Sequence, residues 1–195
     1  MVNVAVFASG SGTNFEAIVN AGIEGLNVAL MICDKPGAFV ISRAERLGVD
    51  YRVIDPHRFP DKAAYETEIV SALKSADIDF ICLAGYMRIV GPTLFEAYRD
   101  RILNIHPALL PSFKGAHAID DAFNFGVKVF GVTVHLIDLT IDGGTILGQR
   151  AFEYHGNDRD EVETRIHEIE HVLYPEVIKE YIATASLSFA EGRGE

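Results

Sequence analysis

The chain has 195 residues, enough to bury one large core, and no composition shift marks a linker, so we expect a single domain. Hydrophobic residues make up 49% and charged residues 23%, which excludes disordered and collagen-like classes. The net charge of -11 opposes broad nucleic-acid binding, and no membrane-sized apolar run or basic leader stands out, so we expect a cytoplasmic protein with neither nucleic acid nor membrane as a partner.

Short apolar runs alternate with amphipathic patterns along the first hundred residues. This alternation is typical of βαβ units and predicts an α/β, Rossmann-like fold, with a mostly parallel sheet and helices on both faces. The expected strands are 2–8, 28–33, 51–54, 80–83 and 102–105, and the expected helices are 14–21, 39–47, 62–75 and 92–98. Within 62–75, helical spacing turns Tyr65, Ile69 and Leu73 inward, and the pattern predicts that Glu66, Glu68 and Lys74 face away.

The second half of the chain carries a helical pattern over 118–125 and two longer alternating runs, 129–137 and 145–152. Turn residues ending in Asp142-Gly143-Gly144 join these runs, which predicts an antiparallel pair at the edge of the sheet. A last helix is expected over 160–181, interrupted by Pro175. We expect one domain over 1–183 and a flexible tail over 184–195.

The first strand leads into Ser9-Gly10-Ser11-Gly12-Thr13-Asn14 and then a helix. The backbone amides of Gly12, Thr13 and Asn14 would face an anion at the helix N-terminus, as a phosphate site requires. Phe15 stands where a dinucleotide fingerprint has its third glycine, which favours a phosphate over a dinucleotide. A glycine-rich turn without a ligand stays open as the alternative.

A second loop, 85–90, follows the fourth strand. Arg88 is suited to hold a carboxylate or a ring heteroatom, and Met87, Ile89 and Val90 to line an apolar pocket. Packing in the core is the alternative for the apolar residues.

Asn104 and His106 stand two apart near the end of the fifth strand, followed by Pro107. Side chains alternate along a strand, so both project from one face, and Pro107 ends the strand where active sites of open α/β sheets lie. Capping of backbone groups is the alternative for this pair. Asp142 is by itself most simply a turn residue, and His135 either orients the site or fills its strand.

The stretch His167-Glu168-Ile169-Glu170-His171 matches the zinc-binding pattern H-E-x-x-H. No third ligand follows at the required spacing, and Pro175 comes four residues after His171. We therefore expect no metal, and a helix that presents Glu170 to a substrate amine and uses its histidines for hydrogen bonds. A zinc hydrolase remains the remote alternative.

Several blocks, in order and over nearly the whole chain, resemble the glycinamide ribonucleotide transformylases, folate-dependent formyltransferases of purine biosynthesis. The blocks are 10–14, 83–88, 104–115, His135 with 142–144, and Glu170-His171 with Tyr174-Pro175. The resemblance implies transfer of the formyl group of 10-formyltetrahydrofolate, as cosubstrate, to the amine of glycinamide ribonucleotide. Both partners are then small molecules, and a homodimer is left open.

The resemblance also implies roles for individual residues. It assigns the phosphoribosyl end to Gly12, Thr13 and Asn14, and the glycinamide end to Pro107 and Glu170. It assigns the folate to the vicinity of Lys62, Met87, Arg88, Ile89, Val90 and Asn104, together with the loop 137–142. At the position of Lys62 the family can carry arginine. Lysine keeps the positive charge but lacks the planar guanidinium group, which can bind a carboxylate through two hydrogen bonds. The place of His117, just after the loop 104–115, allows a substrate-side contact independently of the resemblance.

The implied catalytic residues are Asn104, His106 and Asp142, and the chemistry needs no metal and no covalent intermediate. Asn104 and a charged His106 would donate to the oxyanion that forms on the formyl group, while Asp142 would favour the charged imidazole and order a proton-relaying water. The related methionyl-tRNA formyltransferases need a further domain and must bind a polyanion, which this acidic chain does not suit. Formyltetrahydrofolate deformylase, a hydrolase, is the principal alternative.

Overall fold

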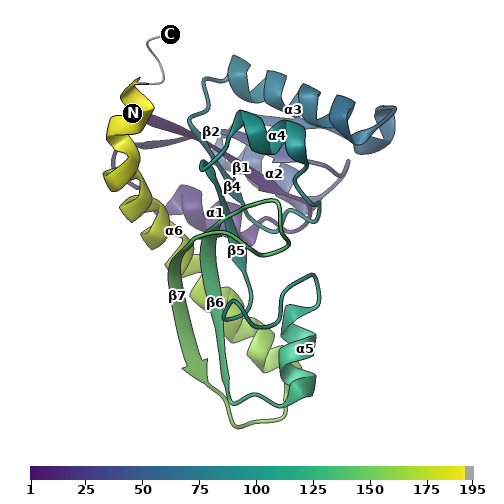
Figure 1. The fold of residues 1–195 in the computed structure, drawn as a ribbon, viewed down its shortest axis with the longest axis vertical. Coiled ribbons are helices and arrows are strands. Elements are labelled where there is room, and N and C mark those ends of the chain that lie inside the picture. Colours follow the sequence, from purple (N-terminus) through teal and green to yellow (C-terminus); the bar gives the residue numbers. More distant parts are fainter. Residues whose placement is uncertain (192–195) are drawn as a thin grey trace.

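The computed structural model describes the backbone of residues 1–191 and the side chains of residues 1–184. Its sheet has seven strands in the order β3-β2-β1-β4-β5-β6-β7 (Figure 1). The strands are β1 (Val2–Ala8), β2 (Leu26–Cys33), β3 (Tyr51–Val53), β4 (Phe80–Leu83), β5 (Ile102–His106), β6 (Val129–Leu136) and β7 (Ile146–Glu153). Strands β1 to β5 are parallel, and β6 and β7 each pair antiparallel with the preceding strand. The expected parallel sheet with an antiparallel edge pair is confirmed.

Helices cover both faces of this sheet, as expected. They are α1 (Thr13–Asn20), α2 (Phe39–Leu47), α3 (Lys62–Ser75), α4 (Pro92–Ala97), α5 (Ala118–Phe125) and α6 (Arg159–Glu191), with a short 3-10 turn, η1 (Pro56–Arg58). One core cluster lies under α1, α2, α5 and α6, and the other lies under α3 and α4. Figure 1 shows α6 running beside β6 and β7. Among residues 1–191 no helix combines the length and apolar character needed to cross a membrane.

The last helix differs from its expected form, because α6 continues through Pro175 to Glu191 instead of being interrupted. Proline removes one helical hydrogen bond and costs about 3 kcal/mol in a helix interior. Here packing offsets that cost: Leu173, Tyr174, Val177 and Ile178 are buried around it. The Tyr174 hydroxyl also donates toward the carbonyl oxygens of two sheet residues, each 3.0 Å away. The helix thereby covers eight residues of the segment expected as a tail, and residues 192–195 lie outside the described part.

The expectation that Glu66 faces away from the core is wrong. Its side chain is buried, and its carboxylate accepts hydrogen bonds from the backbone N–H groups of Gly91 at 2.5 Å and Leu94 at 3.2 Å. These donors belong to the first turn of α4, whose free amides need an acceptor. Gly91 leaves room for this contact, since a Cβ there would lie 2.7 Å from the Glu66 Oε1 atom. A buried carboxylate thus fixes where α4 begins.

The strand order reverses at β1, which pairs with β2 on one side and β4 on the other. In open α/β sheets, ligands bind beyond the carboxyl ends of the strands at such a switch point. The loops 9–12 and 84–91 leave β1 and β4 at this place, and β5 ends next to them with His106. The fold therefore gathers three of the segments predicted to carry function.

Candidate active site

The loops that follow β1 and β4 are tied together directly. The backbone N–H of Ser9 donates to the carbonyl oxygen of Gly85 at 3.1 Å, and the N–H of Met87 donates to the Ser9 hydroxyl at 2.9 Å. Because each loop supplies a donor or an acceptor to the other, the two cannot move independently without breaking these bonds. The loop 9–12, expected to bind an anion, and the loop 84–91, expected to line an apolar pocket, are therefore connected. We call the two loops together the rim.

A cavity of about 380 Å³ opens on the β1 side of this rim. Its walls contain all five residues predicted to bind the acceptor: Gly12, Thr13, Asn14, Pro107 and Glu170. Lys35, His117 and Arg159 also line it and bring positive or titratable groups to an otherwise acidic chain. The amide groups at the N-terminus of α1, together with Lys35, make that end of the cavity suited to an anionic ligand, whereas Arg159 is already paired with Asp120 and Glu163.

Glu170 is buried in the wall of this cavity, and its Oε2 atom accepts two hydrogen bonds. One comes from Asn14 Nδ2 at 2.9 Å and the other from His167 Nδ1 at 2.9 Å. The bond to Glu170 raises the pKa of the His167 imidazole, since the carboxylate favours its charged form. The Oδ1 atom of Asn14 is buried without a partner among the described residues. Glu170 is thus held in place by its neighbours.

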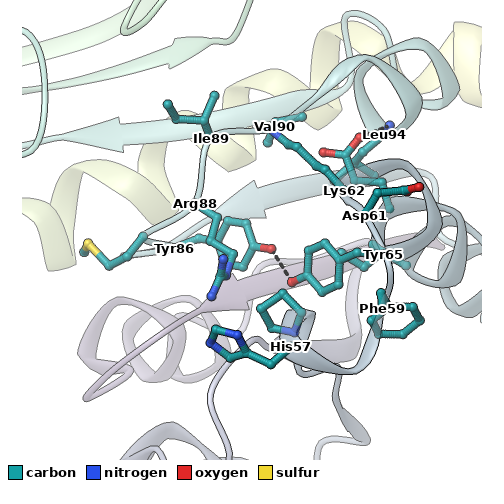
Figure 2. Close-up of a pocket in the computed structure, with 14 residues that line it drawn as sticks. His57, Phe59, Asp61, Lys62, Tyr65, Tyr86, Arg88, Ile89, Val90 and Leu94 are labelled. Atoms are coloured by element: carbon teal, nitrogen blue, oxygen red, sulfur yellow. Dashed lines mark hydrogen bonds between the residues drawn. The ribbon is translucent and has the colours of Figure 1, made fainter.

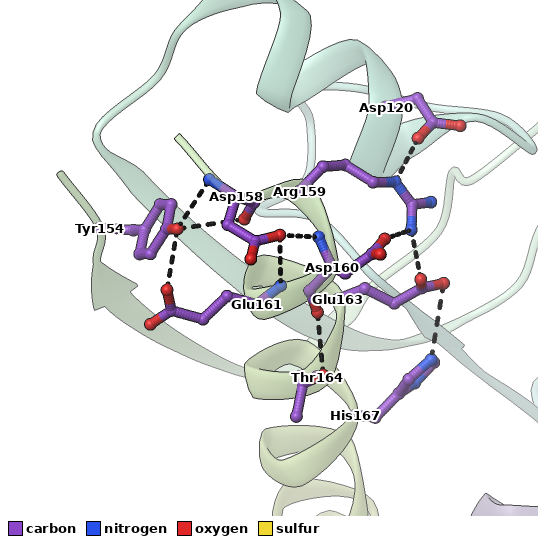
Figure 3. A network of polar contacts seen from close by, with 9 residues as sticks. All are labelled: Asp120, Tyr154, Asp158, Arg159, Asp160, Glu161, Glu163, Thr164 and His167. Atoms are coloured by element: carbon purple, nitrogen blue, oxygen red, sulfur yellow. Dashed lines mark hydrogen bonds and ion pairs between the residues drawn. The ribbon is translucent and has the colours of Figure 1, made fainter. Parts of the chain in front are cut away.

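Acidic and basic side chains between residues 159 and 167 form a series of ion pairs along α6, on the same side of the helix as Glu170. Figure 3 shows Arg159 between Asp120 of α5 and Glu163, with His167 next along the helix. The Arg159 Nε atom donates to Asp120 at 2.7 Å, and Glu163 lies 3.8 Å from His167. Arg159, Glu163 and His167 recur at four-residue spacing, so they share one helix face. These ion pairs join α5 to α6 at the edge of the cavity.

A second cavity, of about 560 Å³, lies on the β4 side of the rim (Figure 2). Five of the residues predicted to bind the folate line it, namely Lys62, Met87, Arg88, Ile89 and Val90. Met87 lines both cavities, so the two adjoin there. In Figure 2 the hydroxyls of Tyr65 and Tyr86 meet across the floor, 2.7 Å apart. An aromatic, largely apolar cavity with a cation at its rim suits a flat ring system bearing a carboxylate.

The guanidinium of Arg88 is engaged within the protein. Its Nε atom donates to Asp34 Oδ2 at 2.7 Å, and only 1% of the Asp34 side chain is exposed. The other carboxylate oxygen, Oδ1, is buried without a partner among the described residues. Arg88 therefore neutralises a buried charge at the end of β2 and pins the loop after β4 to it. Sequence patterns did not single out Asp34 for this role, because the pairing partner lies 54 residues away.

His106, the last residue of β5, is buried between two acceptors. Its Nε2 atom lies 2.8 Å from the carbonyl oxygen of Phe113, and its Nδ1 atom lies 3.5 Å from Asp142 Oδ2. A carbonyl oxygen can only accept, so Nε2 carries a hydrogen, and Nδ1 faces the Asp142 carboxylate. The same Asp142 oxygen accepts from the N–H of Gly115 at 2.6 Å. The structure thus brings together His106 and Asp142, which are 36 residues apart in the chain.

Asn104 is oriented by His135 of the neighbouring strand β6. The Nδ1 atom of His135 lies 2.8 Å from the carbonyl oxygen of Gly143 and 2.9 Å from that of Leu136. Nδ1 is therefore the protonated nitrogen of a neutral ring, and Nε2 accepts from Asn104 Nδ2 at 3.1 Å. Burial lowers the pKa of His135, which favours this neutral form. An orienting role for His135 was one of two possibilities open from the sequence, but the residue that it orients, Asn104, was not identified there.

The loop 138–144 holds Asp142 against His106 in a strained conformation. Asp142 has φ of 46°, and Gly144 has φ of 93° with its Cα so placed that a Cβ would lie 2.0 Å from the Leu136 carbonyl oxygen. Glycine is therefore required at position 144. An aspartate in the left-handed region is uncommon, and such strain often marks a functional residue. The Asp-Gly-Gly sequence thus serves both the turn and the placement of a carboxylate.

The histidines of the H-E-x-x-H pattern do not meet around a common point. His167 bonds to Glu170, as expected, whereas the Nε2 atom of His171 is buried without a partner among the described residues. In the described part of the chain, no group of three or more His, Cys, Asp or Glu side chains is placed to hold a metal ion. That no metal takes part remains a prediction.

Comparison with known proteins extends over almost the whole chain. A family model described as formyl transferase matches residues 2–178. Phosphoribosylglycinamide formyltransferase of Bacillus subtilis (strain 168) is 47% identical over 186 residues, which cover 93% of this chain and 95% of the relative. A crystal structure of phosphoribosylglycinamide formyltransferase from Bacillus halodurans matches with a TM-score of 0.90 at 48% identity, covering 94% of this chain and 96% of the other. Glycinamide ribonucleotide transformylase 1 from Geobacillus kaustophilus matches with a TM-score of 0.90 at 50% identity, covering 93% and 98%.

Proposed function

The chain belongs to the formyl transferase family and, within it, to the phosphoribosylglycinamide formyltransferases of de novo purine biosynthesis, and on that premise we propose how its residues perform the reaction. The acceptor, glycinamide ribonucleotide, occupies the 380 Å³ cavity, and the formyl donor, 10-formyltetrahydrofolate, occupies the 560 Å³ cavity. The two cavities adjoin at Met87, which supports a direct transfer between neighbouring ligands.

The observation that carries the mechanism is the pairing of His106 Nδ1 with Asp142 Oδ2, 3.5 Å apart, beside an Asn104 amide held by His135. When the acceptor amine adds to the formyl carbon, negative charge develops on the formyl oxygen. Asn104 has a second N–H free to donate to that oxygen, and a protonated His106 donates from Nδ1. Loss of one such donor typically costs about a hundred- to a thousandfold in rate.

Proton movement completes the transfer. The attacking amine must lose a proton, and the folate nitrogen must gain one as its bond to the formyl carbon breaks. Asp142 Oδ2 faces His106 Nδ1, so a proton carried by that nitrogen has an acceptor beside it and can be returned. Whether Asp142 passes the proton itself or through an ordered water, the balance is one proton from amine to leaving nitrogen, with no covalent enzyme intermediate.

The binding roles follow from the cavity walls. Gly12, Thr13 and Asn14 hold the phosphoribosyl end through backbone amides, and Pro107 and Glu170 hold the glycinamide end. Met87, Ile89 and Val90 contact the folate rings, and Lys62 attracts a carboxylate of the folate tail. Arg88 acts here through its backbone and its ion pair with Asp34 rather than as a free cation. Asn104 lines neither cavity; its role toward the folate and the oxyanion rests on the family resemblance and on its place two residues before His106.

Beyond these ligands, we expect no nucleic-acid partner for an acidic chain and leave a homodimer open. The cytoplasmic location, the absence of a metal and the domain limits at 183 stay predictions.

An acceptor-dependence assay tests this function. Purified protein is mixed with 10-formyltetrahydrofolate, with and without glycinamide ribonucleotide, and the release of tetrahydrofolate and of formate is followed. The proposal predicts tetrahydrofolate release only with the acceptor, and formylated acceptor as the second product. Formate release without an acceptor would instead identify the deformylase reaction.

A further inference from the structure

The loop 9–12, which is expected to bind phosphate, is held by hydrogen bonds from α2, outside the cavity. The backbone N–H of Val40 donates to the carbonyl oxygen of Gly10 at 3.0 Å, and Arg43 Nε donates to the carbonyl oxygen of Ser11 at 2.8 Å. The carbonyl of Gly12 accepts from the N–H of Glu16 at 3.0 Å, in the first turn of α1. Three successive carbonyls of the loop are therefore committed to helices.

These bonds determine where the loop's amides point. In a planar trans peptide, the carbonyl of one residue and the N–H of the next face opposite sides. Fixing the carbonyls of Gly10 and Ser11 on α2 turns the N–H groups of Ser11 and Gly12 toward the opposite side, where both residues line the 380 Å³ cavity. Within the described part of the chain these N–H groups donate to no protein acceptor. They remain available for a ligand.

Of these hydrogen bonds, the one to the Ser11 carbonyl depends on a single side chain, that of Arg43. The Arg43 guanidinium also pairs with Glu16 and lies over the Phe39 ring, 5.0 Å from its centroid, so its position is fixed on three sides. The bond at Gly10 joins two backbone groups and does not depend on the Arg43 side chain, and Val40 packs closely against the loop, since a Cβ on Gly12 would lie 2.4 Å from Val40. Arg43 does not itself line the cavity among the described residues.

We propose that Arg43 is a positioning residue for the acceptor's phosphate: by holding the Ser11 carbonyl it aims the Gly12 amide at the phosphate without touching the substrate. This inference rests on the proposed phosphate subsite and adds a residue to it. Without the guanidinium, the peptide between Ser11 and Gly12 is free to rotate, and its carbonyl can turn toward the phosphate and repel it. Binding of the phosphate then suffers, whereas the chemistry at His106 does not.

The chain provides a matched control. Arg46 pairs with the same Glu16 carboxylate from the next turn of α2, but its side chain is 58% exposed and, among the described residues, donates to no carbonyl of the loop, whereas the Arg43 side chain is 20% exposed. Arg43→Met and Arg46→Met therefore remove the same charge next to the same acid. Only the first removes the hydrogen bond to Ser11.

The experiment measures steady-state kinetics of wild type, Arg43→Met, Arg43→Lys and Arg46→Met, with glycinamide ribonucleotide and with its counterpart lacking the phosphate. We expect Arg43→Met to raise the KM for the phosphorylated acceptor about tenfold, the size of one lost charged hydrogen bond, with kcat and the folate KM within about twofold. Arg43→Lys should recover part of the loss, and Arg46→Met should behave as wild type. With the acceptor lacking phosphate, the four proteins should be alike.

A second measurement reads the loop directly. Titration of inorganic phosphate into ¹⁵N-labelled protein should shift the Gly12 amide resonance in wild type and Arg46→Met, and much less in Arg43→Met. If wild type shows neither this shift nor a preference for the phosphorylated acceptor, the proposed phosphate subsite itself is wrong. If wild type shows both and Arg43→Met retains both, the subsite stands and the role of Arg43 is overturned.

Discussion

Asn104 donates from Nδ2 to His135 Nε2 across the β5–β6 pairing, at 3.1 Å, and this bond fixes which way the Asn104 amide group is turned. His135 is in turn fixed by its Nδ1 bond to the Gly143 carbonyl, in the loop that carries Asp142. One buried imidazole thus connects the Asn104 amide to the loop that carries Asp142. The positions of Asn104 and of the loop that carries Asp142 therefore both depend on His135.

Replacing His135 by leucine should release the Asn104 amide and lower kcat by up to about a hundredfold, because small misplacements of a catalytic group are that costly. His135→Gln should retain more activity, since its amide can donate toward Gly143 and accept from Asn104. The comparison of kcat at saturating substrates decides this. Equal activity of the leucine variant and wild type would remove His135 from the account.

The stability of the protein should respond to pH through His135. Burial lowers its pKa below the ordinary value of 6.5, so the folded state binds this proton less readily than the unfolded state. Its contribution is therefore present above pH 6.5 and is lost as pH falls through the lowered pKa. Urea unfolding from pH 7.5 to pH 5 should show a shallower loss of stability in His135→Gln than in wild type. Parallel curves would contradict this.

Glu170→Gln should weaken acceptor binding selectively. The buried carboxylate accepts from Asn14 and His167, and its charge is what a substrate amine would recognise. We expect the KM for glycinamide ribonucleotide to rise roughly ten- to a hundredfold, with the folate KM unchanged. Glu168→Gln, an exposed change two residues away on the same helix, is the control. A folate KM that rises equally would mean a general loss of structure.

Arg88 should matter more for stability than for folate recognition. Arg88→Met leaves the buried Asp34 carboxylate unpaired, which typically costs about 3 kcal/mol in the free energy of unfolding. The double variant Arg88→Met/Asp34→Asn removes the charge as well and should recover more than half of that loss. Denaturant titrations of the two single variants and the double variant form the test. If the double variant is no more stable than Arg88→Met, the pair is not coupled.

Local rules predicted the sheet, and they indicated the loops 9–14 and 85–90 and the Asn104–His106 pair as candidates for the site. Strand and helix periods placed the βαβ units, and the two-residue alternation at Asn104 and His106 set their common face. The resemblance to a family supplied Asp142, which local rules favoured only as a turn residue. Its approach to His106 is confirmed by the 3.5 Å distance.

What the sequence could not predict depends on contacts between distant residues. Glu66 looks like a solvent-facing helix residue, yet it is buried because α4 needs an acceptor at its start. Pro175 should interrupt a helix, yet the packing of Tyr174 against the sheet carries α6 through it. Tertiary packing outweighs local preference in both cases.

The roles proposed for Asn104, His106 and Asp142 are tested by the kcat/KM of Asn104→Ala, His106→Ala and Asp142→Asn for formyl transfer to glycinamide ribonucleotide, in variants shown to be folded by thermal unfolding. We expect a fall of at least about a hundredfold for each, because each removes a proposed oxyanion donor or the carboxylate that sustains one. Near wild-type transfer by both His106→Ala and Asp142→Asn would contradict these roles.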